Sequence, residues 1–402
     1  MPVATSHHAR PILNSVMSLI IVKRLVPLAW RNLLHDRVRF AVTLTGIVFS
    51  VLLSAIQLGL FVGFTRATSE IISHSGADVW IRSRGVTHLE TSAPFLERRR
   101  HQVLALPGVA SADPYIVRFG NWTKRDGSVE GILLVGLDLQ SGLGRPWSLV
   151  RGRIEDLAQA DAVIVDELYA AKLGVHDIGD TGEIYGLRAR VVGFTRGIRS
   201  FTTAPPVFAR HVQAQRYLGL ERGETGGQTM YLLVRAAAGV DPATLARRIE
   251  DALPDVTAQT TDAWRAAQQN YWMFGTGAGV TVLIAAGLGL LVGVVVVAQT
   301  IYAATVDHIK EFGTLKAMGA TNRYIYRVIV EQAVISAVAG YVMCMGLAQT
   351  ASAVSQRGTT AIILPWPLTA ALFGVTVGMC ILASVVSINK VTRLDPAIVF
   401  KG

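Results

Sequence analysis

Four long stretches of the chain contain no charged side chain, and they set the pattern from which the fold can be read. They are residues 40–65, 266–306, 332–356 and 358–389. A helix needs about 20 apolar residues to cross the ~30 Å hydrocarbon core of a bilayer, and each stretch can supply one. We therefore predict an α-helical membrane protein with four transmembrane helices, at 40–65, within 266–306, and at 328–350 and 366–388.

The charged residues indicate which side of the membrane each remaining segment faces. Residues 1–39 carry six Lys or Arg and one acidic residue, residues 307–327 carry four and two, and residues 389–402 carry three and one. Residues 66–265 are nearly balanced, with 24 basic and 23 acidic side chains. Since cytoplasmic segments beside spans are enriched in Lys and Arg, we place both termini and the 307–327 loop in the cytoplasm. The net charge of +10 is then a topology signal and does not indicate a nucleic-acid surface.

The external segment, 66–265, has the alternating pattern of an α+β domain. We expect strands at 77–83, 109–117, 129–137, 162–166, 230–234 and 256–259, helices at 94–106, 167–173 and 242–253, and a hairpin from 183–185 and 189–193. The order of these elements predicts two lobes, a βαβ-type lobe with a smaller β-rich lobe inserted into it. Both cysteines, Cys344 and Cys380, fall in predicted spans, so no disulfide is expected in the domain.

Two segments next to the spans are expected to be helical. The apolar pattern of residues 27–38 predicts a short amphipathic helix on the cytoplasmic membrane surface. The alternative is that these residues are an ordinary basic segment before the first span. The interval 266–306 is too long for one crossing, since its helix would extend about 60 Å. We expect Asp262 to Phe274, which includes the interface-type side chains Trp264, Tyr271 and Trp272, to continue the span as a rigid stalk to the external domain.

Glycines four residues apart allow close packing of helices in lipid, within the chain or in a dimer. The pairs are Gly275 and Gly279, Gly289 and Gly293, and Gly374 and Gly378.

Motifs for catalysis or cofactor binding are absent from the sequence. There is no G-x-x-x-x-G-K-[ST], H-E-x-x-H, C-x-x-C or G-x-S-x-G, so we predict no catalytic residue, no metal and no cofactor bound by this chain. Glu331 is the one acidic residue at a predicted span, and Arg327 stands four residues before it. An i,i+4 ion pair explains Glu331 without a proton relay, and the absence of an ion-coupling site argues against a secondary transporter.

The cytoplasmic loop carries an apolar stripe that has no core of its own. A helix is predicted from Val306 to Met318, ending at Gly319. Its apolar positions are three residues apart: Ile309, Phe312, Leu315 and Met318. Such a stripe either lies on the lipid surface or docks into the groove of a partner protein.

The same loop resembles a known family. The segment Glu311–Thr321, EFGTLKAMGAT, is similar to the signature after the second span of FtsX/MacB-type ABC transporter permeases, and within that group to the DevC-like branch. Supporting matches are Pro27–Trp30, Gln57–Gly59, Gly76–Trp80, Asn270–Trp272 and Asp395–Ala397. The likeness runs from about residue 25 to residue 400, and residues 1–22 have no counterpart in it.

This resemblance implies a MacB-type (type VII) ABC permease architecture in a bacterial inner membrane. It implies a homodimer that works with two copies of a separate cytoplasmic ABC ATPase, which uses ATP and Mg, and with a periplasmic membrane-fusion (HlyD-like) adaptor leading to an outer-membrane channel. The implied ATPase-coupling residues are His308, Lys310, Glu311, Phe312, Gly313, Leu315, Lys316, Met318 and Gly319.

Two functions remain open at this point. The first is the permease of an exporter that works by mechanotransmission on a lipid-like or amphiphilic substrate. The alternative is an FtsX-like regulator that transmits force to a cell-wall hydrolase without transporting anything. An enzyme would need convergent Asp, His or Ser residues, and none occurs at a recognisable spacing.

Overall fold

The computed structural model describes residues 37–91, 93–221, 227–307 and 321–391. The chain divides into two compact units. Of these described residues, the membrane unit takes in those of 37–58, 284–350 and 364–391, and the external unit takes in those of 59–283 and 351–363. The predicted interfacial helix lies outside the described residues except for Arg37 and Val38, which begin the first long helix.

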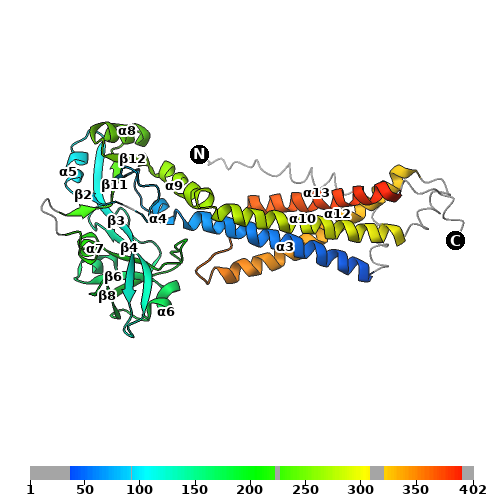
Figure 1. Ribbon diagram of the computed structural model, residues 1–402, viewed down its shortest axis with the longest axis horizontal. Coiled ribbons are helices and arrows are strands. Elements are labelled where there is room, and N and C mark those ends of the chain that lie inside the picture. The colour runs from blue at the N-terminus through cyan, green and yellow to red at the C-terminus, as the bar shows by residue number, and fades with distance from the viewer. Residues whose placement is uncertain (1–36, 92, 222–226, 308–320, 392–402) are drawn as a thin grey trace, which may run out of the picture. The chain divides into compact units, whose positions relative to one another are not determined.

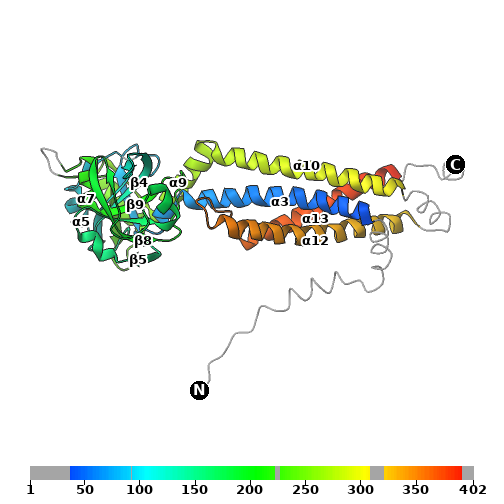
Figure 2. The ribbon, with the colours of Figure 1, turned by 90° about the horizontal axis from the view of Figure 1, so that it is seen from below.

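Four long helices run beside one another in the membrane unit (Figures 1 and 2). They are α3 (Arg37–Ala67), α10 (Ala278–Asp307), α12 (Asn322–Ser355) and α13 (Trp366–Val391). Each contains a stretch long and apolar enough to cross a membrane. Large apolar side chains such as Leu291, Val342 and Leu382 are more than half exposed, as expected for helices that face lipid. The four predicted spans are confirmed, and α12 extends past its predicted bounds at both ends.

Small residues let α3 and α10 approach closely. Gly289 and Gly293 lie against Leu53 and Ser50 of α3, and the Ser50 hydroxyl donates to the Gly289 carbonyl at 3.0 Å. A Cβ added at Gly374 or Gly378 would meet no described atom within 4 Å. Packing of these glycines in a dimer stays a prediction.

The external unit is built on one sheet of ten strands. Its order is β12-β1-β11-β3-β4-β9-β6-β8-β5, with β7 paired to β3 and β8. The strands are β1 (Val79–Ser83), β3 (Val109–Thr123), β4 (Val129–Leu137), β5 (Leu149–Gly152), β6 (Ala162–Asp166), β7 (Thr181–Ile184), β8 (Leu187–Thr195), β9 (Pro206–Arg210), β11 (Tyr231–Ala236) and β12 (Val256–Thr260). A second sheet pairs β2 (Phe95–Leu96) with β10 (Gln228–Thr229).

The long strand β3 changes the predicted picture of two lobes. It pairs with β11 over residues 109–115 and with β4 over residues 115–123. Because one strand serves both regions, a single sheet crosses the two predicted lobes, and the prediction that β3 ends at residue 117 is wrong. Val109–Thr123 instead continues as a long ribbon with β4.

Short helices cover the sheet. They are α4 (Glu70–Ser73), α5 (Arg99–Leu104), α6 (Ala170–Leu173), α7 (His211–Leu218), α8 (Pro242–Ala252) and α9 (Thr261–Asn270), with 3-10 turns η1 (Ile154–Ala158) and η2 (Glu167–Tyr169). One core joins α5 and α8 to β1, β11 and β12, and a larger one contains Trp80, Trp122 and Trp264. The predicted helix 94–106 is wrong at its start, because Phe95 and Leu96 pair with β10 and α5 begins only at Arg99.

The stalk is not the continuous helix that the sequence predicts. Helix α9 ends at Asn270, a π-helix, η3, follows from Tyr271 to Gly275, and α10 starts at Ala278. Between them Gly277 has a φ of +79°, a left-handed conformation that a helix cannot contain. The rigid connection is therefore interrupted by a break just before the second span.

Candidate functional site: the joint of the external unit

The sequence-predicted sites fall in different parts of the chain. The coupling residues His308, Lys310, Glu311, Phe312, Gly313, Leu315, Lys316, Met318 and Gly319 lie outside the described residues. The predicted ion pair is confirmed, with Arg327 Nε 3.0 Å from Glu331 Oε1. Gly275 and Gly279 lie at the stalk break, where Gly279 packs on Met273 and Gly275 near Tyr271. Among the described residues, no group of three or more His, Cys, Asp or Glu could hold a metal ion.

Ends of the membrane helices belong to the external unit. They are the last turns of α3, from Gly59 on, and residues 351–363, which include the start of the loop between α12 and α13. The Ile363 N–H donates to the Gly59 carbonyl at 3.1 Å. The Ala361 carbonyl lies so close to Gly63 that any Cβ there would collide with it. The α12–α13 loop is thus seated on the end of α3.

Residues 196–203, between β8 and β9, form a loop that we call the joint loop. Its start is fixed by the fully buried carboxylate of Asp166, at the end of β6. Asp166 accepts hydrogen bonds from the Ile198 N–H at 2.8 Å, the Gly197 N–H at 3.2 Å and the Thr195 hydroxyl at 2.9 Å. Because these donors are satisfied by one anchored carboxylate, the joint loop leaves β8 in a defined direction.

Arg199 of the joint loop bonds to the α12–α13 loop. Its Nη2 donates to the Gln356 carbonyl at 2.6 Å and its Nε donates to the Gly358 carbonyl at 3.2 Å. Its backbone N–H donates to Oε2 of Glu70, on α4, at 3.2 Å. Burial raises the pKa of Glu70 above its ordinary value, partly offset by this hydrogen bond. Arg199 therefore connects α4, the joint loop and the start of the α12–α13 loop.

Phe201 of the same loop contacts the two remaining membrane connections. Its ring centroid is 5.6 Å from that of Phe64, near the end of α3, with the rings almost perpendicular. It is 4.9 Å from the ring of Trp272 in the π-helix. These are favourable aromatic geometries. One loop of the external domain thus touches the segments that lead into or out of all four spans.

A buried carboxylate also bonds to the π-helix. Glu90 accepts hydrogen bonds from Nε2 of Gln268, at 3.0 and 3.2 Å, and from Nε1 of Trp272 at 3.2 Å. His88 stacks on Tyr271 with ring centroids 4.3 Å apart. Burial is the main cause that raises the pKa of Glu90, and the donated hydrogen bonds lower it in part. The stalk break is therefore packed and hydrogen-bonded at Tyr271 and Trp272.

The raised pKa of Glu90 gives a pH dependence with a definite sign. The ordinary pKa of a glutamate is 4.5, and the pKa of Glu90 in the folded state is higher. At a pH between these two values, Glu90 therefore takes up a proton when the protein folds. The contribution of Glu90 to stability is therefore largest below pH 4.5 and is lost as the pH rises through the folded-state pKa. Glu90→Gln cannot titrate, so we expect a flatter dependence of melting temperature on pH. Melting curves between about pH 4 and about pH 8 test this, with exposed Glu183→Gln as control, and equal slopes for wild type and Glu90→Gln would contradict it.

Sequence reasoning missed most of the joint. It selected Tyr271 and Trp272 as interface aromatics but gave no role to Glu90, Arg199 or Phe201. Both acceptors of the Arg199 side chain in the α12–α13 loop are backbone carbonyls, 157 and 159 residues away, and any residue type provides a carbonyl. The only signal in the sequence was an Arg and a Phe between two strands, a combination too common to mark these residues as functional.

Comparison with known proteins places the chain in a family. Residues 40–252 match the MacB-like periplasmic core domain, and residues 283–396 match the FtsX-like permease C-terminal domain. The chain is 24% identical over 380 residues to the uncharacterized ABC transporter permease Rv0072 of Mycobacterium tuberculosis, covering 93% of this chain and 99% of that protein. It is 23% identical over 380 residues to the uncharacterized ABC transporter permease Mb2592 of Mycobacterium bovis, covering 93% and 97%.

Solved structures of external domains are also similar. The periplasmic region of MacB from Actinobacillus actinomycetemcomitans has 15% identity and a TM-score of 0.36, covering 49% of this chain and 94% of that one. The extracellular domain of the noncanonic ABC-type transporter YknZ from Gram-positive bacteria has 14% identity and a TM-score of 0.34, covering 46% and 98%. The family match over residues 40–252 takes in more than half of the 402 residues, and the chain belongs to the MacB/FtsX type of ABC transporter permeases.

Proposed function

We propose that this permease is the membrane subunit of an ATP-driven exporter that works by mechanotransmission. The observation that carries the proposal is the joint loop, whose Arg199 and Phe201 contact the ends of α3, the π-helix before α10 and the α12–α13 loop. A relative movement of the spans would strain these contacts and so move the external domain. The joint would turn movement within the membrane into work outside it.

The chemistry of the chain is consistent with such a role. The one acidic residue predicted at a span, Glu331, is paired with Arg327, so an ion path is not needed to explain it. The sequence holds no phosphate-binding loop. Energy would come from a separate cytoplasmic ABC ATPase, and the cytoplasmic segment His308–Gly319 would be the element that receives it.

The remaining partners follow from the family resemblance. We propose a homodimer in a bacterial inner membrane, with both termini cytoplasmic, which engages a periplasmic membrane-fusion adaptor and an outer-membrane channel. The DevC-like features of the sequence favour a lipid-like or amphiphilic substrate.

Phe312→Asp is expected to uncouple ATP hydrolysis from export. The substitution places a charge in the apolar stripe that would dock into the ATPase, and desolvating that charge opposes docking. Since the stripe lies outside the spans, the membrane fold should be retained. Substrate-stimulated ATP hydrolysis and export by the reconstituted complex are the measurements. Lys310→Ala, beside the stripe, is the milder comparison, and unchanged activities for Phe312→Asp would refute the coupling role.

Identification of the partners tests the proposal as a whole. The chain is cross-linked in its native membrane, purified in mild detergent and analysed by mass spectrometry. An ABC ATPase together with a membrane-fusion adaptor supports an exporter. An ATPase with a cell-wall hydrolase or its activator would favour the regulator instead, and the absence of any ATPase would refute both.

A further inference from the structure

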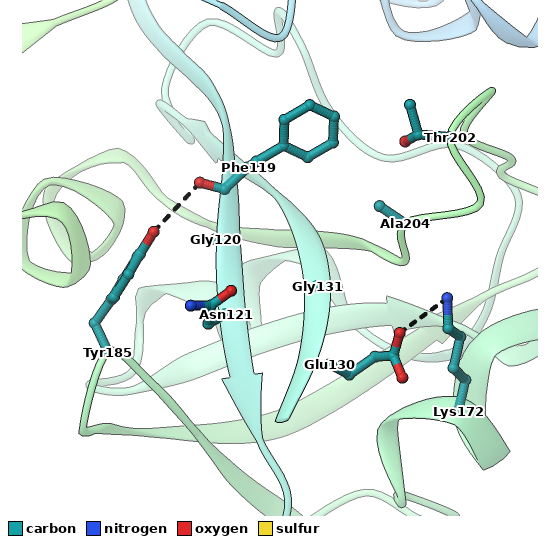
Figure 3. Close-up of a pocket in the computed structure, with 9 residues that line it drawn as sticks. All are labelled: Phe119, Gly120, Asn121, Glu130, Gly131, Lys172, Tyr185, Thr202 and Ala204. Carbon is teal, nitrogen blue, oxygen red and sulfur yellow. Dashed lines mark hydrogen bonds and ion pairs between the residues drawn. The ribbon is translucent and has the colours of Figure 1, made fainter. Parts of the chain in front are cut away.

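A pocket lies beside the end of the β3–β4 ribbon that is close to the turn between these two strands (Figure 3). The proposed function does not use this pocket. Its volume is about 410 Å³, within the range of about 300–1,000 Å³ that is typical of small-ligand sites. It is lined by residues from β3, β4, α6, the β7–β8 turn and the end of the joint loop. All of these belong to the external unit.

Tyr185 forms one wall of the pocket in an unfavourable backbone conformation. It occupies the two-residue turn between β7 and β8 with a φ of +50°, followed by Gly186 with a φ of +76°. Turns of this kind favour Asn, Asp or Gly at both positions, and a bulky residue at positive φ is rare. The Tyr185 side chain is nevertheless half exposed. Strain that is kept at an exposed aromatic residue points to a function for its ring.

The Tyr185 ring contacts the neighbouring strand β3. A Cβ on Gly120 would lie 3.4 Å from Cε2 of Tyr185, an ordinary contact distance, so the edge of the ring lies against β3. The Tyr185 hydroxyl donates to the Phe119 carbonyl at 3.5 Å. The Phe119 side chain is itself 38% exposed. Phe119 and Tyr185 are thus two partly exposed aromatic residues among those that line the pocket.

A second glycine opens the floor of the pocket. Gly131 on β4 pairs with Asn121 on β3, and a Cβ on Gly131 would meet no described atom within 4 Å. The β4–β9 pairing begins only at Leu133, whose N–H donates to the Pro205 carbonyl at 2.9 Å. Gly131 lies two residues earlier, so its N–H and C=O point toward the same edge. A ligand there could approach the strand backbone directly.

The polar groups of the pocket are balanced in charge. Nζ of Lys172 is 3.0 Å from Oε1 of Glu130, so neither charge is available as an isolated partner for an ion. The Asn121 amide can both donate and accept hydrogen bonds, and the Thr202 hydroxyl, which lies 3.0 Å from the Ser200 hydroxyl, has capacity for one more. Hydroxyl groups are suited to this mixture, while the flat C–H faces of a sugar ring can pack on aromatic rings.

We propose that this pocket binds a neutral saccharide the size of a disaccharide, free or as the headgroup of a larger molecule. Phe119 and Tyr185 pack against the sugar rings, and Asn121, Glu130 and Lys172 bond their hydroxyls. The site belongs to the external domain alone and does not depend on whether the complex exports a substrate. Thr202 and Ala204, at the end of the joint loop and just after it, line the pocket, so an occupied site would also restrict the loop that carries Arg199.

Ligand-observed NMR on the full chain in phosphatidylcholine nanodiscs tests the proposal. Saturation transfer to cellobiose, maltose or free digalactose is the readout, and glucose 6-phosphate is the charged comparison. We expect transfer to the ring protons of at least one neutral disaccharide and weaker transfer to the phosphate ester. Nanodiscs with and without digalactosyl diacylglycerol distinguish a lipid-borne headgroup, which would slow hydrogen exchange in residues 119–131 and 199–204 only when the glycolipid is present.

Two variants remove the site without disturbing the fold. Gly131→Val fills the open floor at an ordinary strand position, and Tyr185→Asn removes the ring while fitting the positive φ of its turn. Val129→Thr, exposed at 60% on the same strand and outside the pocket, is the control. We expect at least a tenfold loss of affinity in the first two variants, with unchanged melting temperatures, and none in the control. Equal binding by wild type and both variants, stronger binding of the phosphate ester, or no response to any sugar or to the glycolipid would overturn the proposal.

Discussion

Asp166→Ala is expected to lower the free energy of unfolding of the external domain by about 3–4 kcal/mol. Its carboxylate is fully buried and accepts hydrogen bonds from four donors: the Leu168 N–H, the Thr195 hydroxyl, the Gly197 N–H and the Ile198 N–H. Alanine leaves all four donors without that acceptor and a small cavity beside them. The penalty of buried, unsatisfied donors is what makes the expected effect large.

Denaturant unfolding of the full chain in detergent, followed by tryptophan fluorescence, measures this loss. Asp166→Asn keeps the size but replaces one acceptor oxygen with a donor nitrogen, so its loss should be smaller than that of alanine. Asp251→Ala, exposed near the end of α8, is the matched control and should change stability by less than about 0.5 kcal/mol. A loss below about 1 kcal/mol for Asp166→Ala would mean that the carboxylate does not anchor the joint loop.

Local sequence signals predicted the regular elements of the fold well. β4 and β6 were predicted at their observed bounds, because alternation or an apolar run extends over the whole strand. Helix α8 was found within one residue of its end, since Asp241 caps it and Pro242 occupies its first turn. Gly174 ends α6 with a φ of +67°, as expected of a glycine after a helix.

The errors arose where distant parts of the chain determine the structure. The length of β3 depends on its pairing with β4, which continues past Val117 to Thr123. The stalk read as a continuous helix because residues 266–306 carry no charge, and charge patterning does not reveal a left-handed glycine. The helix breaks at the left-handed Gly277, and Trp272 just before it is bonded to Glu90. Neither feature follows from helical periodicity.

The joint could not be predicted for a further reason. Its bonds join side chains to backbone groups, as with Arg199 and the carbonyls of Gln356 and Gly358. It also depends on which loops the sheet brings beside the ends of the spans. The four spans, by contrast, follow from composition alone, because each must satisfy the bilayer independently. The four spans could therefore be predicted from the sequence more reliably than the contacts that would transmit force.

The double substitution Arg199→Gln and Phe201→Ala is expected to lower the amount of substrate exported per ATP hydrolysed by about tenfold. A change of this size lies within the typical range of coupling between two sites. The pair provides the side-chain contacts of the joint loop with the α12–α13 loop, with Phe64 of α3 and with Trp272 of the π-helix. Without them the spans can move while the external domain stays behind. Basal ATP hydrolysis should persist, because the substitutions lie in the external unit.

Two readouts separate this loss of coupling from a loss of fold. Hydrogen exchange should increase in residues 356–363, while the free energy of unfolding falls by less than about 1 kcal/mol for Arg199→Gln alone, since its side-chain bonds are solvent-exposed. Arg196→Gln is a matched control in the same loop, because Arg196 pairs with Glu167 at 2.9 Å and has no recorded bond to the α12–α13 loop. Arg199→Lys keeps the positive charge, but a lysine cannot donate to both carbonyls from one planar group. Its activity should therefore lie between that of Arg199→Gln and that of the wild type. If Arg196→Gln impairs coupling as strongly as the double variant does, a general change in loop charge explains the effect, and the joint contacts do not transmit the force.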